Sequence, residues 1–332
     1  MAGNLEPQPL PQANEVELLT RDQFYRQLTI SAEQFVPPEL QEKLRTANIL
    51  IAGAGSIGNP IAMTAIRSGA ENITVADPDS VEESNLARQE YQFYQTGKNK
   101  AQMTALNMRL VNPHASKTIT SEKEGITLEN AEEYVRKADV VIDAVDIRAL
   151  DVIWELHKQA AEQKKPVVVG YDLAGTAMLA VYRYDKEDMK PLAGDLTEEK
   201  IAEFRHVKEL HQQGSIDEAS FLDYVYESFT GPINPLDVPV EQFQEIIDRK
   251  EGDTRTYQIG TTSRALSALA VETVRRILNG EEVKKVIAVD LPTEVRKQNP
   301  NVIRKLSLMF RALGSIQARG KRVHQTLDIL NN

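Results

Sequence analysis

The sequence predicts an α/β fold: a doubly wound, mostly parallel sheet of the Rossmann type with an inserted polar lobe. Short apolar runs, which suit buried parallel strands, alternate with longer segments of helical periodicity. The first apolar run ends directly in a glycine-rich turn, and a helical segment follows that turn. Strands that alternate with helices in this way indicate a sheet with helices on both faces.

Apolar runs and helical periodicity assign the elements along the chain. Pro37-Pro38 precedes a short helical stretch, and residues 176–184 alternate apolar and polar residues like an exposed antiparallel strand. The helix expected near the C-terminus has arginines in its last turn and Gly280 as its stop signal. The expected strands are 48–52, 73–76, 140–142, 167–169 and 286–289, and the expected helices are 58–68, 100–111, 150–163 and 266–278.

Four regions follow from composition. Residues 1–20 are a flexible N-terminal arm rich in Pro, Gln and Asn, and residues 21–185 form the nucleotide-binding core. Residues 186–256 are polar and acidic and are interrupted by Gly-Pro and Asn-Pro pairs, which predicts an inserted lobe. Residues 257–332 return to the core and supply sheet elements, and the cations at helical spacing from 304 to 324 predict a solvated amphipathic helix.

Composition excludes several classes of function. The net charge of −10 argues against nucleic-acid binding. The chain contains no cysteine, which excludes disulfides, a cysteine-ligated zinc site and a thioester on this chain. The N-terminus lacks a signal peptide and no apolar run is long enough to span a membrane, so we expect a cytoplasmic protein.

Aromatic and imidazole side chains add little to the functional argument. Trp154 falls on the apolar face of its expected helix, which predicts core packing. No pair of histidines has metal-ligand spacing, so we expect surface positions for all five: His114, His157, His206, His211 and His324.

The glycine-rich turn is Gly53-Ala54-Gly55-Ser56-Ile57-Gly58. Its position between a strand and a helix favours phosphate binding, because glycines let the backbone approach a phosphate at the helix N-terminus. A tight turn without a ligand is the structural alternative. Asp77 ends the second expected strand, about 20 residues on, where a carboxylate can accept hydrogen bonds from a ribose diol. These features alone favour NAD.

The segment after Asp77 changes that interpretation. It reads DPDSVEESNLARQ, ends at Gln89, and carries its own Asp79, Asn85 and Arg88. This run resembles the signature of the ubiquitin-activating (E1-like) superfamily, the ThiF/MoeB/HesA adenylyltransferases, and the resemblance covers most of residues 21–185 together with 260–278. It implies that the turn binds ATP together with Asp79, Asn85, Arg88 and Gln89. It also implies that the inserted lobe at 186–256 faces the substrate and that residues 257–332 supply dimer elements.

Further positions are similar to the same family. Tyr25-Arg26-Gln27 resembles the family opening whose arginine reaches the ATP site of the partner protomer, which implies a homodimer in which Arg26 acts in trans. Gly97-Lys98-Asn99-Lys100-Ala101 resembles the step that brings a lysine to the phosphates, so Lys100 takes that role. The strand end at 141–146 is similar to the family's D-x-x-D segment, which makes Asp146 the Mg²⁺ ligand. Ile147-Arg148 departs from the asparagine that many members have there.

Adenylation chemistry asks for the same types of residue. A carboxylate oxygen attacks the α-phosphorus and pyrophosphate leaves with growing negative charge, so fixed cations such as Arg26, Arg88 and Lys100 favour the reaction. Structural alternatives stay open: surface ion pairs for the cations, and helix capping for the aspartates. For Asp143 we prefer the cap.

The sequence therefore predicts an ATP- and Mg²⁺-dependent adenylyltransferase that needs no zinc. It would activate the C-terminal carboxylate of a small ubiquitin-like protein or peptide as an acyl-adenylate, without a cysteine thioester. Two alternatives stay open, an NAD(P)-dependent oxidoreductase and a catalytically inactive E1-like scaffold subunit. The acyl substrate, the acceptor and the pathway are not encoded in any motif we can interpret.

Overall fold

A computed structural model describes residues 19–229, 231–249, 252–255, 257–298 and 302–330. The arm expected at residues 1–20 lies outside this part, apart from residues 19 and 20. Within it, no helix is long and apolar enough to cross a membrane. The strands are β1 (Asn48–Ala52), β2 (Asn72–Ala76), β3 (Ile119–Glu122), β4 (Val140–Asp143), β5 (Val167–Leu173), β6 (Thr176–Tyr182) and β7 (Val286–Asp290).

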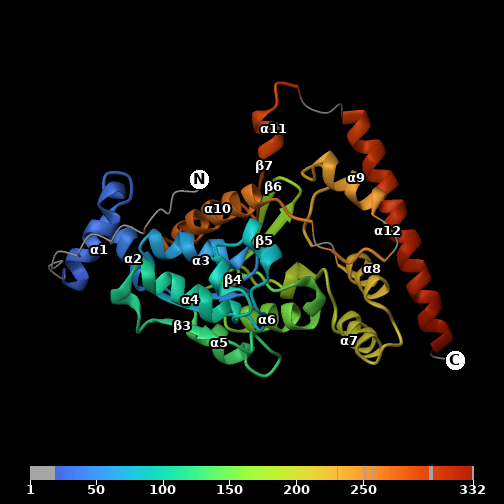
Figure 1. Ribbon diagram of the computed structural model, residues 1–332, viewed down its shortest axis with the longest axis horizontal. Helices are drawn as coiled ribbons and strands as arrows, with labels where there is room; N and C mark the ends of the chain where they lie inside the picture. Colours follow the sequence, from blue (N-terminus) through green and yellow to red (C-terminus); the bar gives the residue numbers. More distant parts are fainter. Residues whose placement is uncertain (1–18, 230, 250–251, 256, 299–301, 331–332) are drawn as a thin grey trace, which may run out of the picture.

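The described α-helices surround this sheet and extend beyond it at both ends (Figure 1). They are α1 (Arg21–Thr29), α2 (Pro38–Thr46), α3 (Gly58–Arg67), α4 (Lys100–Val111), α5 (Ala131–Lys137), α6 (Leu150–Glu162), α7 (Glu198–Gln212), α8 (Glu218–Ser228), α9 (Val240–Asp248), α10 (Gly260–Leu278), α11 (Leu291–Val295) and α12 (Val302–Leu330).

The strands form one sheet in the order β3-β2-β1-β4-β5-β6-β7. The pairs from β3 to β5 are parallel, whereas β6 pairs antiparallel with both β5 and β7. The chain reverses direction across the sheet between β1 and β4, which is the topological switch point where ligands bind in open α/β sheets. The predicted mostly parallel, doubly wound sheet is confirmed.

Helices cover both faces of the sheet, and each face has its own apolar core. Ile51 of β1 packs with α3, α4 and α10 on one face, and Leu50, its neighbour, packs with α5 and α6 on the other. This alternation follows from the strand, whose successive side chains point to opposite faces. Trp154 of α6 is buried in the second core, as predicted.

The strand at β6 is antiparallel as expected, but the expectation that it is exposed is wrong. All of its residues are buried, because β7 pairs with its far edge and cores lie on both faces. Leu179 belongs to the core under α10, and Tyr182 belongs to the opposite core.

Between β6 and α10 the chain forms α7, α8 and α9, which lie at one end of the molecule beside the long helix α12 (Figure 1). Thr197 and Asp217 cap the N-termini of α7 and α8 by accepting hydrogen bonds from backbone N–H groups. The predicted amphipathic helix near 304–324 is part of α12, and its buried face packs against α8 and α9. The division of the chain into four regions stays a prediction.

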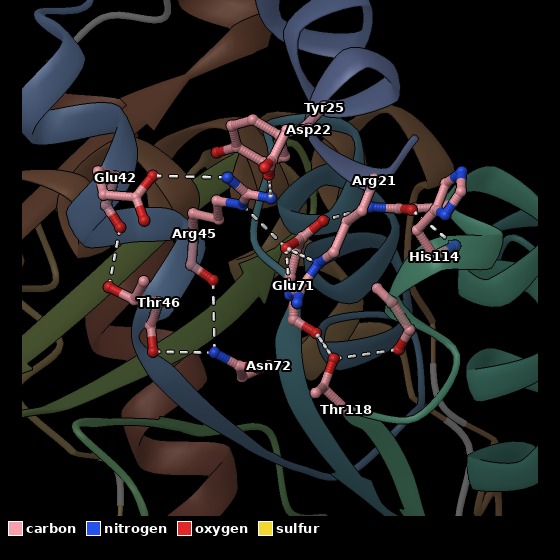
Figure 2. Close-up of polar contacts among 12 residues, drawn as sticks. Arg21, Asp22, Tyr25, Glu42, Arg45, Thr46, Glu71, Asn72, His114 and Thr118 are labelled. Carbon is pink, nitrogen blue, oxygen red and sulfur yellow. Dashed lines mark hydrogen bonds and ion pairs between the residues drawn. The ribbon is translucent and has the colours of Figure 1, made fainter. Parts of the chain in front are cut away.

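At the end of the molecule away from α12, the buried Glu71, just before β2, holds α1 and α2 through ion pairs (Figure 2). The Glu71 carboxylate is fully buried and accepts hydrogen bonds from Arg21 at 2.6 Å, Arg45 at 3.0 Å and Asn112 at 3.1 Å. The Arg45 guanidinium also lies 4.1 Å from the centre of the Tyr25 ring. We call Arg21, Arg45, Glu71 and Asn112 the Glu71 cluster.

Candidate active site

The glycine-rich turn connects β1 to α3 at the switch point of the sheet. Gly53 has φ +98°, and a side chain there would overlap the Ala144 carbonyl at the end of β4. A side chain at Gly58 would overlap the Gly53 carbonyl oxygen, whereas a Cβ at Gly55 would meet no atom within 4 Å. Gly53 and Gly58 therefore keep the turn tight, and Gly55 leaves open space where a ligand can approach the backbone.

Asp77, directly after β2, holds this turn from the side. One carboxylate oxygen accepts the Ala54 N–H at 2.5 Å and the other accepts the Asp79 N–H at 2.8 Å. Burial raises the pKa of Asp77, while these hydrogen bonds and Lys100 act in the opposite direction. Asp77 lines the cavity described below, but much of its acceptor capacity is used inside the protein.

The segment after Asp77 brings the predicted phosphate-binding side chains close to the turn. Lys100, at the start of α4, forms an ion pair with Asp79 at 2.9 Å, in which the lysine side chain is 11% exposed and the aspartate 66%. Asn85 is buried and accepts a hydrogen bond from the Glu82 N–H. Gln89 is also buried, and its Oε1 atom has no hydrogen-bond partner among the described residues.

Arg88 is linked to the turn through Gln258, a residue that the sequence analysis did not identify. The Gln258 Oε1 atom accepts hydrogen bonds from Ser56 Oγ at 2.7 Å and from Arg88 Nε at 2.9 Å. Gln258 lies two residues before α10, which begins at Gly260, as the family resemblance implies, and not at 266, as the apolar pattern predicts. The N-cap residue of α10 is Ile259, which makes no side-chain capping hydrogen bond, so no start signal in the sequence pointed to Gln258.

The loop after β4 carries Asp146, which projects at the cavity wall with 61% of its side chain exposed. Its carboxylate accepts the Arg148 N–H at 2.9 Å and pairs with the Arg148 guanidinium at 3.1 Å. Arg148 also reaches Glu218 of α8 at 3.0 Å and the Thr254 carbonyl at 3.3 Å. The residue that departs from the family pattern therefore links this loop to the segment between β6 and α10.

The helix-cap interpretation of Asp143 is wrong, because Asp146 caps the short 3₁₀-helix Ile147–Ala149 instead. Asp143 is buried, accepts the Val145 N–H at 3.1 Å and lies 3.2 Å from Nε2 of His157. The expectation of a surface position for His157 is also wrong: it is fully buried, with its Nδ1 atom 2.8 Å from the Tyr184 hydroxyl. A carboxylate on one side and a hydroxyl on the other satisfy the imidazole and allow this burial.

One cavity of about 1440 Å³ runs along the carboxyl ends of the strands. It extends from the turn, across β4 and β5, to α8, α9 and α12. Gly58 lies at its base outside the lining, and Arg26 lies on α1 at the far end of the molecule, exposed and outside the lining (Figure 1). The other predicted site residues all line it: Gly53, Gly55, Ser56, Ile57, Asp77, Asp79, Asn85, Arg88, Gln89, Lys100 and Asp146.

Asp172 of β5 is an acid of the cavity that the sequence analysis did not identify. It lines the cavity, and one of its oxygens lies 3.4 Å from the Ser263 hydroxyl in the first turn of α10. The other oxygen is buried without a hydrogen-bond partner in the described part of the chain. Burial raises the pKa of Asp172 to about 6, and the Ser263 and Thr262 hydroxyls and Arg88 oppose the increase.

The sheet order and the glycine-rich turn place this chain among the Rossmann-type α/β proteins, with its cavity at the switch point of the sheet. A sequence model described as the ThiF family matches residues 25–307, so the chain belongs to the ThiF family.

Two curated relatives match shorter parts of the chain. It is 30% identical over 165 residues to the sulfur carrier protein adenylyltransferase of Thermus thermophilus, covering 49% of this chain and 55% of that protein. It is 35% identical over 117 residues to the sulfur carrier protein ThiS adenylyltransferase of Bacillus subtilis, covering 34% of this chain and 35% of that protein. The chain thus spans about half or less of the length of these relatives.

Two solved structures share the fold. PaaA has a TM-score of 0.53 and 18% identity, with 88% of this chain and 86% of that chain covered. The Escherichia coli tRNA N6-threonylcarbamoyladenosine dehydratase, TcdA, has a TM-score of 0.52 and 17% identity, with 79% and 98% covered. At this level of identity the comparison establishes the architecture.

Proposed function

We propose that this chain is an ATP-dependent adenylyltransferase that converts a carboxylate into an acyl-adenylate. One observation carries the proposal: the glycine-rich turn, Arg88, Lys100 and Asp146, which come from four separate segments, line the same cavity. Membership of the ThiF family and relatives named as adenylyltransferases support the same activity.

In the proposed reaction a carboxylate oxygen attacks the α-phosphorus of ATP. A new bond between that oxygen and phosphorus forms, the bond to the bridging oxygen breaks, and pyrophosphate leaves with the electron pair. Negative charge grows on the leaving group, so Lys100 and Arg88 would stabilise the transition state as fixed cations beside the turn. Backbone N–H groups at the start of α3 would bind phosphate oxygens.

Magnesium suits the residues at this site. Among the described residues no three His, Asp or Glu side chains gather around one point, but Mg²⁺ is commonly held by one or two carboxylates together with substrate phosphates. Asp146, exposed at the cavity wall, is the proposed ligand. When bound, the ion would neutralise charge on the phosphate oxygens.

The partners in this proposal are a small ubiquitin-like protein or peptide, which supplies the carboxylate, and a second copy of the chain. Arg26 would complete the site of the partner protomer, because it lies far from the cavity of its own chain. The 332 residues contain no cysteine, so the activated acyl group would pass directly to an external nucleophile. A cytoplasmic location stays a prediction from the sequence.

ATP–pyrophosphate exchange tests the proposal. We expect exchange that depends on Mg²⁺ and on a carboxylate substrate, and loss of exchange in Asp146→Asn with unchanged secondary structure. Parallel titrations with ATP and NAD separate this function from the oxidoreductase. Binding of NAD but not ATP would refute the proposal, and tight ATP binding without AMP formation from any carboxylate would favour the inactive scaffold.

A further inference from the structure

The cavity continues past the proposed nucleotide site into a part with a different lining. Its volume of about 1440 Å³ exceeds the 300–1,000 Å³ usual for a site that holds one small ligand. The additional space lies between β5, α9 and α12. We call it the apolar annex and define it by six cavity-lining residues: Leu173, Ile233, Ile246, Met309, Leu313 and Ile316.

Helix α12 supplies half of the annex from a single face. Met309, Leu313 and Ile316 have the i, i+4, i+7 spacing that aligns side chains along a helix. Leu308 and Ala312, one position earlier in each turn, are buried in a small core with residues of α9. Leu313, by contrast, is 42% exposed. The helix therefore packs through Leu308 and Ala312. Met309 contacts that core at the edge of the cavity, and Leu313 and Ile316 line the cavity beyond it.

The annex is continuous with the proposed reaction centre. Leu173 lines the same cavity as Asp172, whose carboxylate interacts electrostatically with Arg88. Gly170, earlier in the same strand, lies against Ile57 of the glycine-rich turn, since a Cβ there would come within 2.6 Å of that side chain. The annex thus begins on the strand that borders the turn.

Sheet order argues that the annex is not the adenosine site. Asp77, the proposed ribose contact, follows β2, and β1 and β4 lie between β2 and β5. A nucleotide with its ribose near Asp77 and its phosphates at the turn therefore extends away from the annex. The cations near the annex are also paired, Arg319 with Asp223 at 3.0 Å and Arg249 with Glu245 at 2.6 Å, which makes it a poor phosphate site.

We propose that the annex binds a large apolar side chain, of the size of Leu, Ile, Met or Phe, at the C-terminal residue of the peptide whose carboxylate is activated. This inference rests on the proposed function. A terminal glycine would leave the annex unfilled, so the site selects against glycine-ended tails. Discrimination by even one methylene in such a pocket reaches ~10-fold or more, and we expect at least about 10-fold here.

Binding and turnover test the annex separately. The probes are fluorescent heptapeptides of identical sequence that end in Leu or Gly, titrated against the full chain by anisotropy, with ATP–pyrophosphate exchange measured on the same pair. We expect the Leu-ended peptide to bind at least ~10-fold more tightly. Equal affinity for the two peptides, or no binding of either, would refute the proposal that the annex binds an apolar C-terminal side chain. Tight binding of the Leu-ended peptide without exchange overturns adenylation and leaves the annex standing.

Two substitutions on α12 form a matched pair for this test. Leu313→Asp introduces a charge into the annex at a half-exposed position, so the helix should persist. Phe310→Asp makes the same change at a side chain that is 68% exposed and outside the cavity lining. We expect Leu313→Asp to weaken binding of the Leu-ended peptide ~10-fold and to leave the affinity for ATP unchanged. The affinity of Phe310→Asp for the same peptide should stay within about twofold of the wild type. Equal effects of the two variants would refute the assignment.

Discussion

The Glu71 cluster and the proposed nucleotide site both contain ion pairs, but they differ in the exposure of the acid. Glu71 is fully buried, and its carboxylate is shared by Arg21, Arg45 and Asn112. In the cavity the acids of the two ion pairs face solvent: Asp79 is 66% exposed beside Lys100, and Asp146 is 61% exposed beside Arg148.

This difference separates a structural role from a binding role. Burial works to raise the pKa of Glu71, yet hydrogen bonds from Arg21, Arg45 and Asn112 hold it below its ordinary value. Breaking such a cluster leaves buried charge unpaired, which is costly. Asp79 and Asp146 keep most of their side chains in solvent, so we expect Lys100 and Asp146 to exchange their present partners for a phosphate and a metal more easily than Glu71 could exchange its own.

The largest expected effect is on catalysis. Lys100→Ala removes a fixed cation from the proposed phosphate site and should lower the ATP–pyrophosphate exchange rate by ~10³-fold or more. The free energy of unfolding should change little, because the Asp79 that it leaves is solvated. The control is Lys98→Ala, an exposed lysine two residues earlier. Comparable activity in both variants would remove Lys100 from the site.

The next effect is on stability. Glu71→Gln removes the buried acid that Arg21 and Arg45 share and leaves Arg45, which is only 16% exposed, with the exposed Asp22 at 2.7 Å as its main partner. It should lower the free energy of unfolding by roughly 2 kcal/mol in urea titrations at neutral pH. Glu42→Gln is the control: this exposed acid lies 3.8 Å from the same arginine, and its loss should cost under ~1 kcal/mol.

The pH dependence of the Glu71 effect has a definite sign. A carboxyl with a lowered pKa stabilises the fold above its ordinary pKa, and this contribution disappears as the pH falls through the folded-state value. The difference between Glu71→Gln and the wild type should therefore shrink in acid. A constant difference across the titration would show that charge is not the cause.

The smallest effect concerns Asp172, whose pKa is raised to about 6 by burial. A raised pKa means that ionisation of the carboxyl destabilises the fold, so the penalty is absent below the ordinary pKa and complete above the folded one. Asp172→Asn should thus be more stable than the wild type at pH 8, and the difference should vanish toward pH 4. Thermal unfolding across that range is the measurement. A variant that is less stable at pH 8 would mean that Arg88 and the first turn of α10 favour the charged form.

Sequence patterns predicted the parallel sheet because its strands are fully buried and read as continuous apolar runs. The strand β3, with sequence ITSE, was missed because it is short, polar and at the sheet edge. Helices α7 to α9 were read only as a polar lobe, although buried residues of α7 and α8 join the core on the α6 face and α9 packs against α12. The prediction that β6 is exposed was wrong because the segments that bury it, β7 and the two flanking cores, are distant in the sequence.

Within the site, the predictable residues were those in a contiguous motif, such as Asn85, Arg88 and Lys100. Gln258 and Arg148 act through contacts that span 202 and 70 residues respectively, and a local pattern does not reveal such contacts. His157 was assigned to the surface from the average behaviour of histidine, whereas Asp143 and Tyr184 satisfy both ring nitrogens in the core.

The hydrogen bonds of Gln258 also bear on how the molecule is assembled. Ser56 in the glycine-rich turn and Arg88 both depend on a residue that emerges from the ribosome long after them. Contacts of such high sequence separation slow folding, because a long stretch of chain must be ordered before they form. A nascent chain that ends before Gln258 lacks the residue that links Ser56 to Arg88, so the native arrangement around the turn cannot form until the start of α10 has been synthesised.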